Sequence, residues 1–151
     1  MGHKKAYKYG RFEARVRVDD DPSLATSAVL LTWPTSERWP ADGENDFYET
    51  TTNRRQSFHT YIHYMQNGTH KQHHKEHKFD AREWHVIAME WEEEHIKVYI
   101  NEKLQWTLTD KNAIPQVPHR LCIQLDAFKK QMVDPVRMQM DWVKIYQKKK
   151  D

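Results

Sequence analysis

The sequence contains little glycine and little cysteine, and each shortage excludes a feature. Its four glycines, Gly2, Gly10, Gly43 and Gly68, are too scattered for a phosphate-binding loop or a dinucleotide-binding fingerprint. The only cysteine, Cys122, has no second cysteine with which to form an intramolecular disulfide. Nucleotide-dependent enzymes of these types are therefore excluded, and no internal disulfide is expected.

Long apolar stretches are also missing, and neither sign of charge dominates. Hydrophobic residues make up 38% of the 151 residues, and no stretch of them is long enough to cross a membrane. The start of the chain, Met1-Gly2-His3-Lys4-Lys5, lacks the apolar segment of a signal peptide. The 24 Lys and Arg residues nearly balance the 22 Asp and Glu residues, which argues against nucleic-acid binding. We therefore expect neither a membrane nor a nucleic acid as partner.

Short alternating patterns predict an all-β protein. Phe12, Ala14, Val16 and Val18 alternate with charged residues over 11–18, as in a strand with one buried face. Similar apolar patterns, mostly joined by short polar turns, predict further strands at 28–33, 58–64, 85–91, 96–100, 104–108, 121–127 and 136–146. Because no convincing amphipathic helix lies between them, we expect an antiparallel sandwich or barrel.

A histidine-rich stretch at 70–78 offers spacings that can bind metal ions. His70, His73, His74 and His77 form pairs three and four residues apart, which on a helix could hold Zn²⁺ or Cu²⁺. Lysines interleave with these histidines and would repel a divalent cation. We therefore interpret 70–78 as a solvated loop and expect neither a metal site nor a cofactor.

The segment 39–50 contains three carboxylates within six residues. On a regular strand Glu44 and Asp46 share one face and Glu49 points to the other, because side chains alternate. A β-bulge between Asp46 and Glu49 would return Glu49 to the face of the other two. Two carboxyl groups about 5 to 5.5 Å apart are the arrangement of retaining glycosidases. The spacing therefore suggests an acidic catalytic cluster, although acidic residues also occur on exposed strands to discourage edge pairing.

The same segment, Trp39-Pro-Ala-Asp-Gly-Glu-Asn-Asp-Phe-Tyr-Glu, resembles the catalytic strand of family 16 glycoside hydrolases, whose motif is Glu-x-Asp-x-x-Glu after a Gly and a Trp-Pro loop. Three further segments resemble other parts of that family, so the resemblance spans nearly the whole chain. They are Tyr9-Gly-Arg-Phe-Glu-Ala-Arg-Val, Phe79-Asp-Ala-Arg-Glu-Trp-His with Glu90-Trp91, and Met140-Asp-Trp-Val-Lys-Ile-Tyr-Gln.

This resemblance implies a β-jelly-roll sandwich of two antiparallel sheets, of the concanavalin A type, with a concave cleft. It implies a retaining endo-hydrolase of β-1,3 or mixed-linkage β-glucans or related polysaccharides, extracellular and monomeric. By the same resemblance Glu44 is the nucleophile, Asp46 the assisting carboxylate and Glu49 the general acid/base. The pattern also implies that Glu13, His63 and Gln124 contact sugar hydroxyls. The rings of Trp33 and Trp39, beside the acidic strand, could stack on pyranose faces.

Two departures from the family pattern suggest an alternative function. Asn45 stands where the family has an apolar side chain pointing into the core, and a buried amide without partners costs about 1 to 3 kcal/mol. The single domain expected over 1–151 also starts close to Tyr9-Gly10-Arg11, which several strands precede in family members. We therefore consider impaired activity, and an inactive or non-catalytic glycan-binding module on the same fold as the alternative.

Overall fold

The computed structural model describes residues 1–50 and 53–149, and these residues form strands joined by turns. No helix long and apolar enough to cross a membrane occurs within these two ranges. The strands are β1 (Gly2–Tyr7), β2 (Gly10–Val18), β3 (Thr26–Pro34), β4 (Glu44–Thr50), β5 (Phe58–Gln66), β6 (Thr69–His77), β7 (His85–Trp91), β8 (Ile96–Ile100), β9 (Lys103–Leu108), β10 (His119–Ala127) and β11 (Met138–Tyr146).

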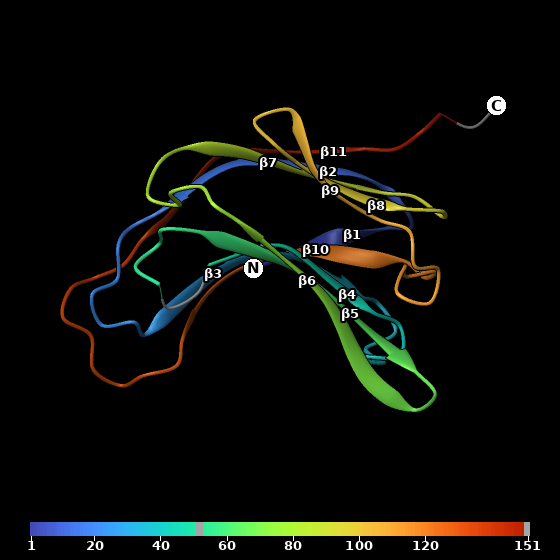
Figure 1. Ribbon diagram of the computed structural model, residues 1–151, viewed down its shortest axis with the longest axis horizontal. Helices are drawn as coiled ribbons and strands as arrows, with labels where there is room; N and C mark the ends of the chain where they lie inside the picture. The colour runs from blue at the N-terminus through green and yellow to red at the C-terminus, as the bar shows by residue number, and fades with distance from the viewer. Residues whose placement is uncertain (51–52, 150–151) are drawn as a thin grey trace.

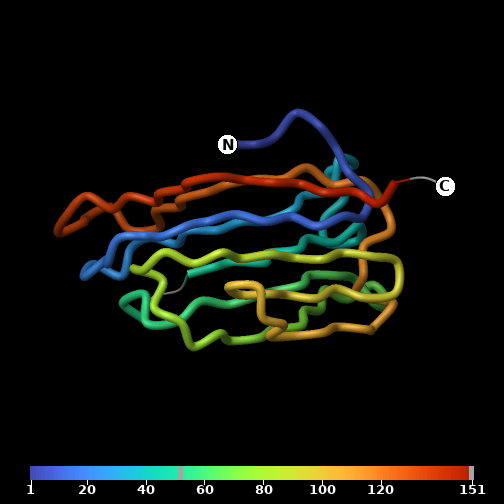
Figure 2. The backbone as a smooth tube through the Cα atoms, turned by 90° about the horizontal axis from the view of Figure 1, so that it is seen from above, coloured from blue at the N-terminus to red at the C-terminus, as the bar shows by residue number. Residues whose placement is uncertain are grey.

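The strands build two antiparallel sheets that pack face to face as two layers (Figure 1). The six-stranded sheet has the order β1-β10-β3-β4-β5-β6, and the five-stranded sheet has the order β11-β2-β7-β8-β9. Seen from above, the strands of both layers run along the long axis of the molecule (Figure 2). The green β5–β6 hairpin bends away from the five-stranded sheet, so the outer surface of the six-stranded sheet is concave (Figure 1). The expected jelly-roll sandwich is confirmed.

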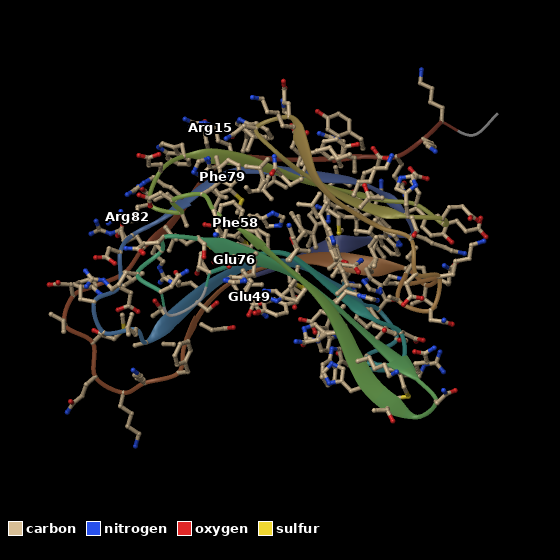
Figure 3. The ribbon with its side chains drawn as sticks, in the orientation of Figure 1. Arg15, Glu49, Phe58, Glu76, Phe79 and Arg82 are labelled. Carbon is tan, nitrogen blue, oxygen red and sulfur yellow. The ribbon has the colours of Figure 1, made fainter. Side chains whose placement is uncertain are left out.

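The core lies between the two sheets and follows the predicted alternation. In β2 the side chains of Phe12, Ala14, Val16 and Val18 are buried, while the charged residues between them are half-buried on the outer face. The six-stranded sheet contributes large side chains such as Phe58, which lies between the layers in Figure 3. Burying one such side chain stabilises the fold by about 1.5 to 3 kcal/mol. In β2 the outer face is therefore left to charged side chains.

The expected loop at 70–78 is wrong, because most of this stretch forms β6. Residues 67 and 68 make a two-residue turn, with φ of 53° at Asn67 and 74° at Gly68, as in a type I′ hairpin. The turn brings β6 beside β5, and the two strands pair from Gln66 with Thr69 to Phe58 with His77. β6 is an edge strand and mostly exposed, so its sequence lacks the apolar alternation that identifies half-buried strands.

Candidate active site

A β-bulge in β4 brings the three predicted carboxylates to one face of the six-stranded sheet. Asp46 pairs with Tyr61 and Glu49 pairs with His59, so two residues of β4 stand opposite the single residue Thr60. Those two residues, 47 and 48, are both buried in the core. The extra residue reverses the parity of the strand after Asp46. The expected bulge is confirmed, and Glu49 shares the outer face with Glu44 and Asp46.

The three carboxylates line an open pocket of about 230 Å³ on the concave outer face. Figure 3 shows Glu49 on the side of the six-stranded sheet that faces away from the five-stranded sheet. The pocket is lined by Val29, Leu31, Trp39, Glu44, Asp46, Glu49, His63, Gln124 and Asp126. Four strands, β3, β4, β5 and β10, and the loop that contains Trp39 therefore supply one site.

Burial raises the pKa of all three carboxyl groups, and a neighbouring negative charge raises each of them further. The pKa of Glu44 rises to about 8, first through burial and then through the close approach of Asp46. Burial raises the pKa of Asp46 to about 7, to which the charge of Glu49 contributes. The pKa of Glu49 is raised by burial and by the charges of Glu44 and Asp126, against the influence of His63. The cluster therefore retains a proton at neutral pH.

Four of the five residues predicted to contact sugar lie in or beside this pocket. His63, which pairs with Glu44 across the strands, places its Nε2 3.0 Å from Asp46 Oδ2. Gln124 lines the pocket from β10. The Trp39 ring lies beside Glu44 and stacks on Trp33, with 6.4 Å between ring centroids and 6° between ring planes. The structure thus brings these side chains together, while their contacts with sugar remain predictions.

The prediction that Glu13 belongs to the same cleft is wrong. Glu13 lies in β2 of the five-stranded sheet, where its carboxylate pairs with Arg11 at 3.0 Å. It shares the outward parity of Arg15, which Figure 3 shows on the outer side of that sheet, opposite to Glu49. Alternation correctly assigned Glu13 to a polar face, but each sheet of a sandwich has its own outer face.

Sequence reasoning missed several residues around the pocket. Asp126 follows Gln124 at a spacing of two in β10 and lines the same pocket, so strand parity could have identified it. A row of neighbouring aromatic and histidine rings also continues from the pocket across β5 and β6. Its successive ring contacts join Trp39 to His63 and His70, His63 to Tyr61, Tyr61 to His74, and His74 to His59, with centroids 4.5–6.2 Å apart. His63 is a predicted site residue, but the sequence does not assign His70 and His74 to this face, because it predicts a loop in place of β6.

The lysines of β6 lie on the face of the sheet opposite to this row of rings. Lys71 pairs with Tyr64 and Lys75 pairs with Thr60, two β5 residues whose side chains are buried on the core side. His70 and His74 alternate with these lysines and point to the concave face. The argument that the lysines repel a cation therefore fails for the concave face, where Glu44, Asp46 and His63 offer metal-ligating atoms within 4.8 Å of one another.

Asn45 is fully buried beneath the cluster, as expected, but its amide is not isolated. Its Nδ2 donates to Thr32 Oγ1 at 3.1 Å, and the Thr32 hydroxyl lies 2.9 Å from His119 Nδ1. His119 Nε2 donates to the Asp42 carbonyl oxygen at 2.8 Å, and burial lowers the pKa of this histidine to about 4. His119 is thus neutral and accepts from Thr32 through Nδ1. Within this chain of hydrogen bonds, the Oδ1 atom of Asn45 has no hydrogen-bond partner.

Comparison with known proteins points to one family. The family model for glycosyl hydrolases family 16 matches residues 1–144. The clotting factor G alpha subunit of Tachypleus tridentatus is 28% identical over 103 residues, which are 64% of this chain. The chain spans only 15% of the length of that subunit.

Solved structures share the fold at low sequence identity. The LamAcat structure from Zobellia galactanivorans is 20% identical with a TM-score of 0.83, covering 97% of this chain and 67% of that one. The laminarinase from Rhodothermus marinus is 24% identical with a TM-score of 0.79, covering 95% and 67%. The β-glucanase of Bacillus licheniformis is 23% identical with a TM-score of 0.75, covering 97% and 69%.

Proposed function

The chain belongs to family 16 of the glycosyl hydrolases, and on this premise we propose that it hydrolyses internal bonds of a β-glucan with retention of anomeric configuration. The observation that carries the proposal is the bulge in β4, which gathers Glu44, Asp46 and Glu49 on one concave face. Two carboxyl groups flanking a glycosidic bond are what a retaining double displacement requires. The laminarinase and β-glucanase among the structural neighbours support a β-glucan as substrate.

In the proposed reaction Glu49 acts first as an acid. Its raised pKa, caused by burial and by neighbouring carboxylates, keeps a proton available for the glycosidic oxygen. Glu44 attacks the anomeric carbon as the sugar leaves, and a covalent glycosyl-enzyme forms. Glu49, now ionised, removes a proton from water, which attacks the same carbon and releases the product with its configuration retained. Both carboxyl groups return to their starting states.

Asp46 has a supporting role in this reaction. The pKa values of Glu44 and Asp46, about 8 and about 7, keep a proton in this pair at neutral pH. Attack by Glu44 requires that this proton lie on Asp46, which then donates a hydrogen bond toward the nucleophile. His63, 3.0 Å from Asp46 Oδ2, supports that carboxyl group from β5. Asp46 therefore tunes the nucleophile while remaining outside the covalent chemistry.

The aromatic rings beside the cluster support binding of a sugar chain. Trp39 is 41% exposed at the pocket, and the row of rings continues to Tyr61 and His74. Flat amphipathic rings of this kind pack against pyranose faces. The same row would serve the alternative function, a glycan-binding module without catalysis, so hydrolysis and binding have to be measured separately.

The test is release of reducing ends from laminarin, barley β-glucan, lichenan and agarose by the wild type, Glu44→Gln and Glu49→Gln. We expect wild-type activity on at least one β-glucan and a loss of at least about 1000-fold in each variant, since both carboxyl groups act in the same reaction. Glu102→Gln, at an exposed turn, is the matched control and should retain full activity.

An activated aryl glycoside separates the two roles. Its leaving group needs no proton, so Glu49→Gln should still form the glycosyl-enzyme with it, whereas Glu44→Gln should not. Full activity of Glu44→Gln on glucan would refute the assignment of the nucleophile. Glucan binding by calorimetry without hydrolysis by the folded wild type would establish the binding module instead.

A further inference from the structure

Three side chains of the pocket that have roles in the proposed hydrolysis also form a donor set for a metal ion. Glu44 and Asp46 of β4 and His63 of β5 offer one ligand atom each, and these atoms lie within 4.8 Å of one another. Within this set, His63 Nε2 lies 3.0 Å from Asp46 Oδ2. Ligands about 2.0 to 2.1 Å from a tetrahedral Zn²⁺ are about 3.3 Å from each other, so small side-chain movements suffice to close the set.

Asp46 supplies an independent observation that points to a ligand. Its side chain is only 3% exposed, and its Oδ1 is buried without a hydrogen-bond partner, although the residue lines an open pocket. A buried carboxylate oxygen without a partner carries a desolvation cost that a bound cation removes. The second oxygen, Oδ2, already faces His63. Asp46 therefore has one buried carboxylate oxygen without a hydrogen-bond partner, while its other oxygen belongs to the three-donor set.

His63 is oriented in the manner of a metal-ligating histidine. Its Nε2 faces the carboxylates, and its Nδ1 lies 3.0 Å from His70 Nε2. Histidine ligands usually donate the N–H of the second ring nitrogen to a neighbouring acceptor, which fixes the ring and its tautomer. His70, on the concave face of β6, provides that acceptor when His63 carries its proton on Nδ1. The β6 lysines lie on the opposite face and do not oppose a cation here.

We propose that Glu44, Asp46 and His63 form a binding site for one divalent transition-metal cation of the Zn²⁺ type, and that the bound cation blocks the active site. Imidazole combined with carboxylate is a donor set for zinc, whereas Ca²⁺ takes six to eight oxygen ligands and Mg²⁺ demands an octahedral shell. The fourth position opens to the pocket and is left for water. Because the cation occupies the proposed nucleophile, it excludes the sugar. Binding is independent of the proposed hydrolysis, and only inhibition rests on it.

Titration calorimetry with ZnCl₂ in a non-coordinating buffer at pH 7.5 tests the binding. We expect one saturable site in the wild type and a dissociation constant raised more than about 100-fold in His63→Ala, because a direct ligand is lost. His70→Ala removes only the supporting acceptor and should weaken binding by about 10- to 100-fold. His59→Ala is the matched control, since it lies on the same strand and face, and it should bind as the wild type does.

Zinc X-ray absorption of the wild-type complex identifies the zinc ligands without any variant, so a folding defect in a variant cannot affect the result. We expect one imidazole and otherwise oxygen donors. Two or more imidazoles, or unchanged affinity in folded His63→Ala, or affinity lost in His59→Ala, would overturn the site in favour of the exposed histidine pairs. Absence of saturable binding would overturn it as well.

Measuring hydrolysis in the presence of Zn²⁺ tests the blocking role separately from the proposed function. Zn²⁺ should inhibit glucan hydrolysis competitively with substrate and be reversed by EDTA. Zinc bound at this site by a protein that hydrolyses no glucan would refute the function and leave the metal site standing. Hydrolysis that is unaffected by saturating Zn²⁺ would refute the blocking role.

Discussion

Asp46 and Glu49 lie three residues apart in β4, yet their partners in β5, Tyr61 and His59, lie only two residues apart. This difference of one residue turns the Glu49 carboxyl group from the core to the concave face. The two residues between Asp46 and Glu49 are both aromatic and both 1% exposed. The bulge thus places two aromatic side chains in the core and turns the Glu49 carboxyl group into the pocket.

The bulge residue Tyr48 carries a buried hydroxyl without a hydrogen-bond partner. Replacing it with phenylalanine keeps the ring and removes the unsatisfied group, so Tyr48→Phe should raise the free energy of unfolding by about 1 kcal/mol. Urea unfolding at pH 7 measures the change. Tyr9→Phe is the control, because the Tyr9 hydroxyl donates to Gln116 Oε1 at 2.6 Å and its removal should bring no gain. A loss of stability in Tyr48→Phe would show that the hydroxyl is satisfied in solution.

The charge of Glu44 should destabilise the folded protein at high pH. The pKa of Glu44 in the folded protein, about 8, lies above its ordinary value of 4.5. The ionised carboxylate therefore destabilises the folded protein at alkaline pH. This destabilisation disappears as the pH falls, because Glu44 then carries its proton in the folded protein. Glu44→Gln should therefore be more stable than the wild type at pH 8.5, on the order of 1 to 2 kcal/mol after allowing for solvent screening. Near pH 4 the two should unfold alike. Equal stability of both proteins at pH 8.5 would contradict the raised pKa.

Asp126 should shift the alkaline limit of activity. Its charge contributes to the raised pKa of Glu49, the proposed proton donor. Removing a negative charge lowers the pKa of a neighbouring acid, so in Asp126→Asn the fall of kcat/KM at high pH should begin at a lower pH than in the wild type. Asp141→Asn, on a strand of the other sheet, is the control and should keep the wild-type profile. If the fall of kcat/KM in Asp126→Asn began at the same pH as in the wild type, or at a higher pH, Asp126 would have no such effect on the pKa of Glu49.

The buried chain from Asn45 to His119 should depend more on its hydroxyl than on its amide. Thr32→Val leaves Asn45 Nδ2 and His119 Nδ1 without the partner that joins them, and should cost about 2 kcal/mol or more of unfolding free energy. Asn45→Val loses one hydrogen bond but also removes the unpaired Oδ1, so its stability should stay within about 1 kcal/mol of the wild type. Thermal or urea unfolding of both variants measures these changes in the free energy of unfolding. If Asn45→Val were the more damaging change, the amide and not the hydroxyl would be the central member.

The sequence alone predicts those strands whose residue pattern does not depend on a partner strand. Alternation in β2, for example, reflects one buried and one solvated face, and this pattern can be recognised without knowing any partner strand. The carboxylates of β4 were identifiable for the same reason, because the shared face of Glu44, Asp46 and Glu49 follows from parity and one bulge. The resemblance of the catalytic segment then suggested the family.

Only the tertiary structure decided which strands share a surface. Parity placed Glu13 on an outer face, but the pairing of β2 with β7 and β11 put that face on the opposite side of the sandwich from the pocket. β6 has no apolar face of its own, and its place in the sheet depends on hydrogen bonds to β5. Asp126 joins the acidic cluster because β10 pairs with β3, far from it in sequence. Such pairings arise from long-range hydrogen bonds and packing, which the composition and periodicity of a single strand do not contain.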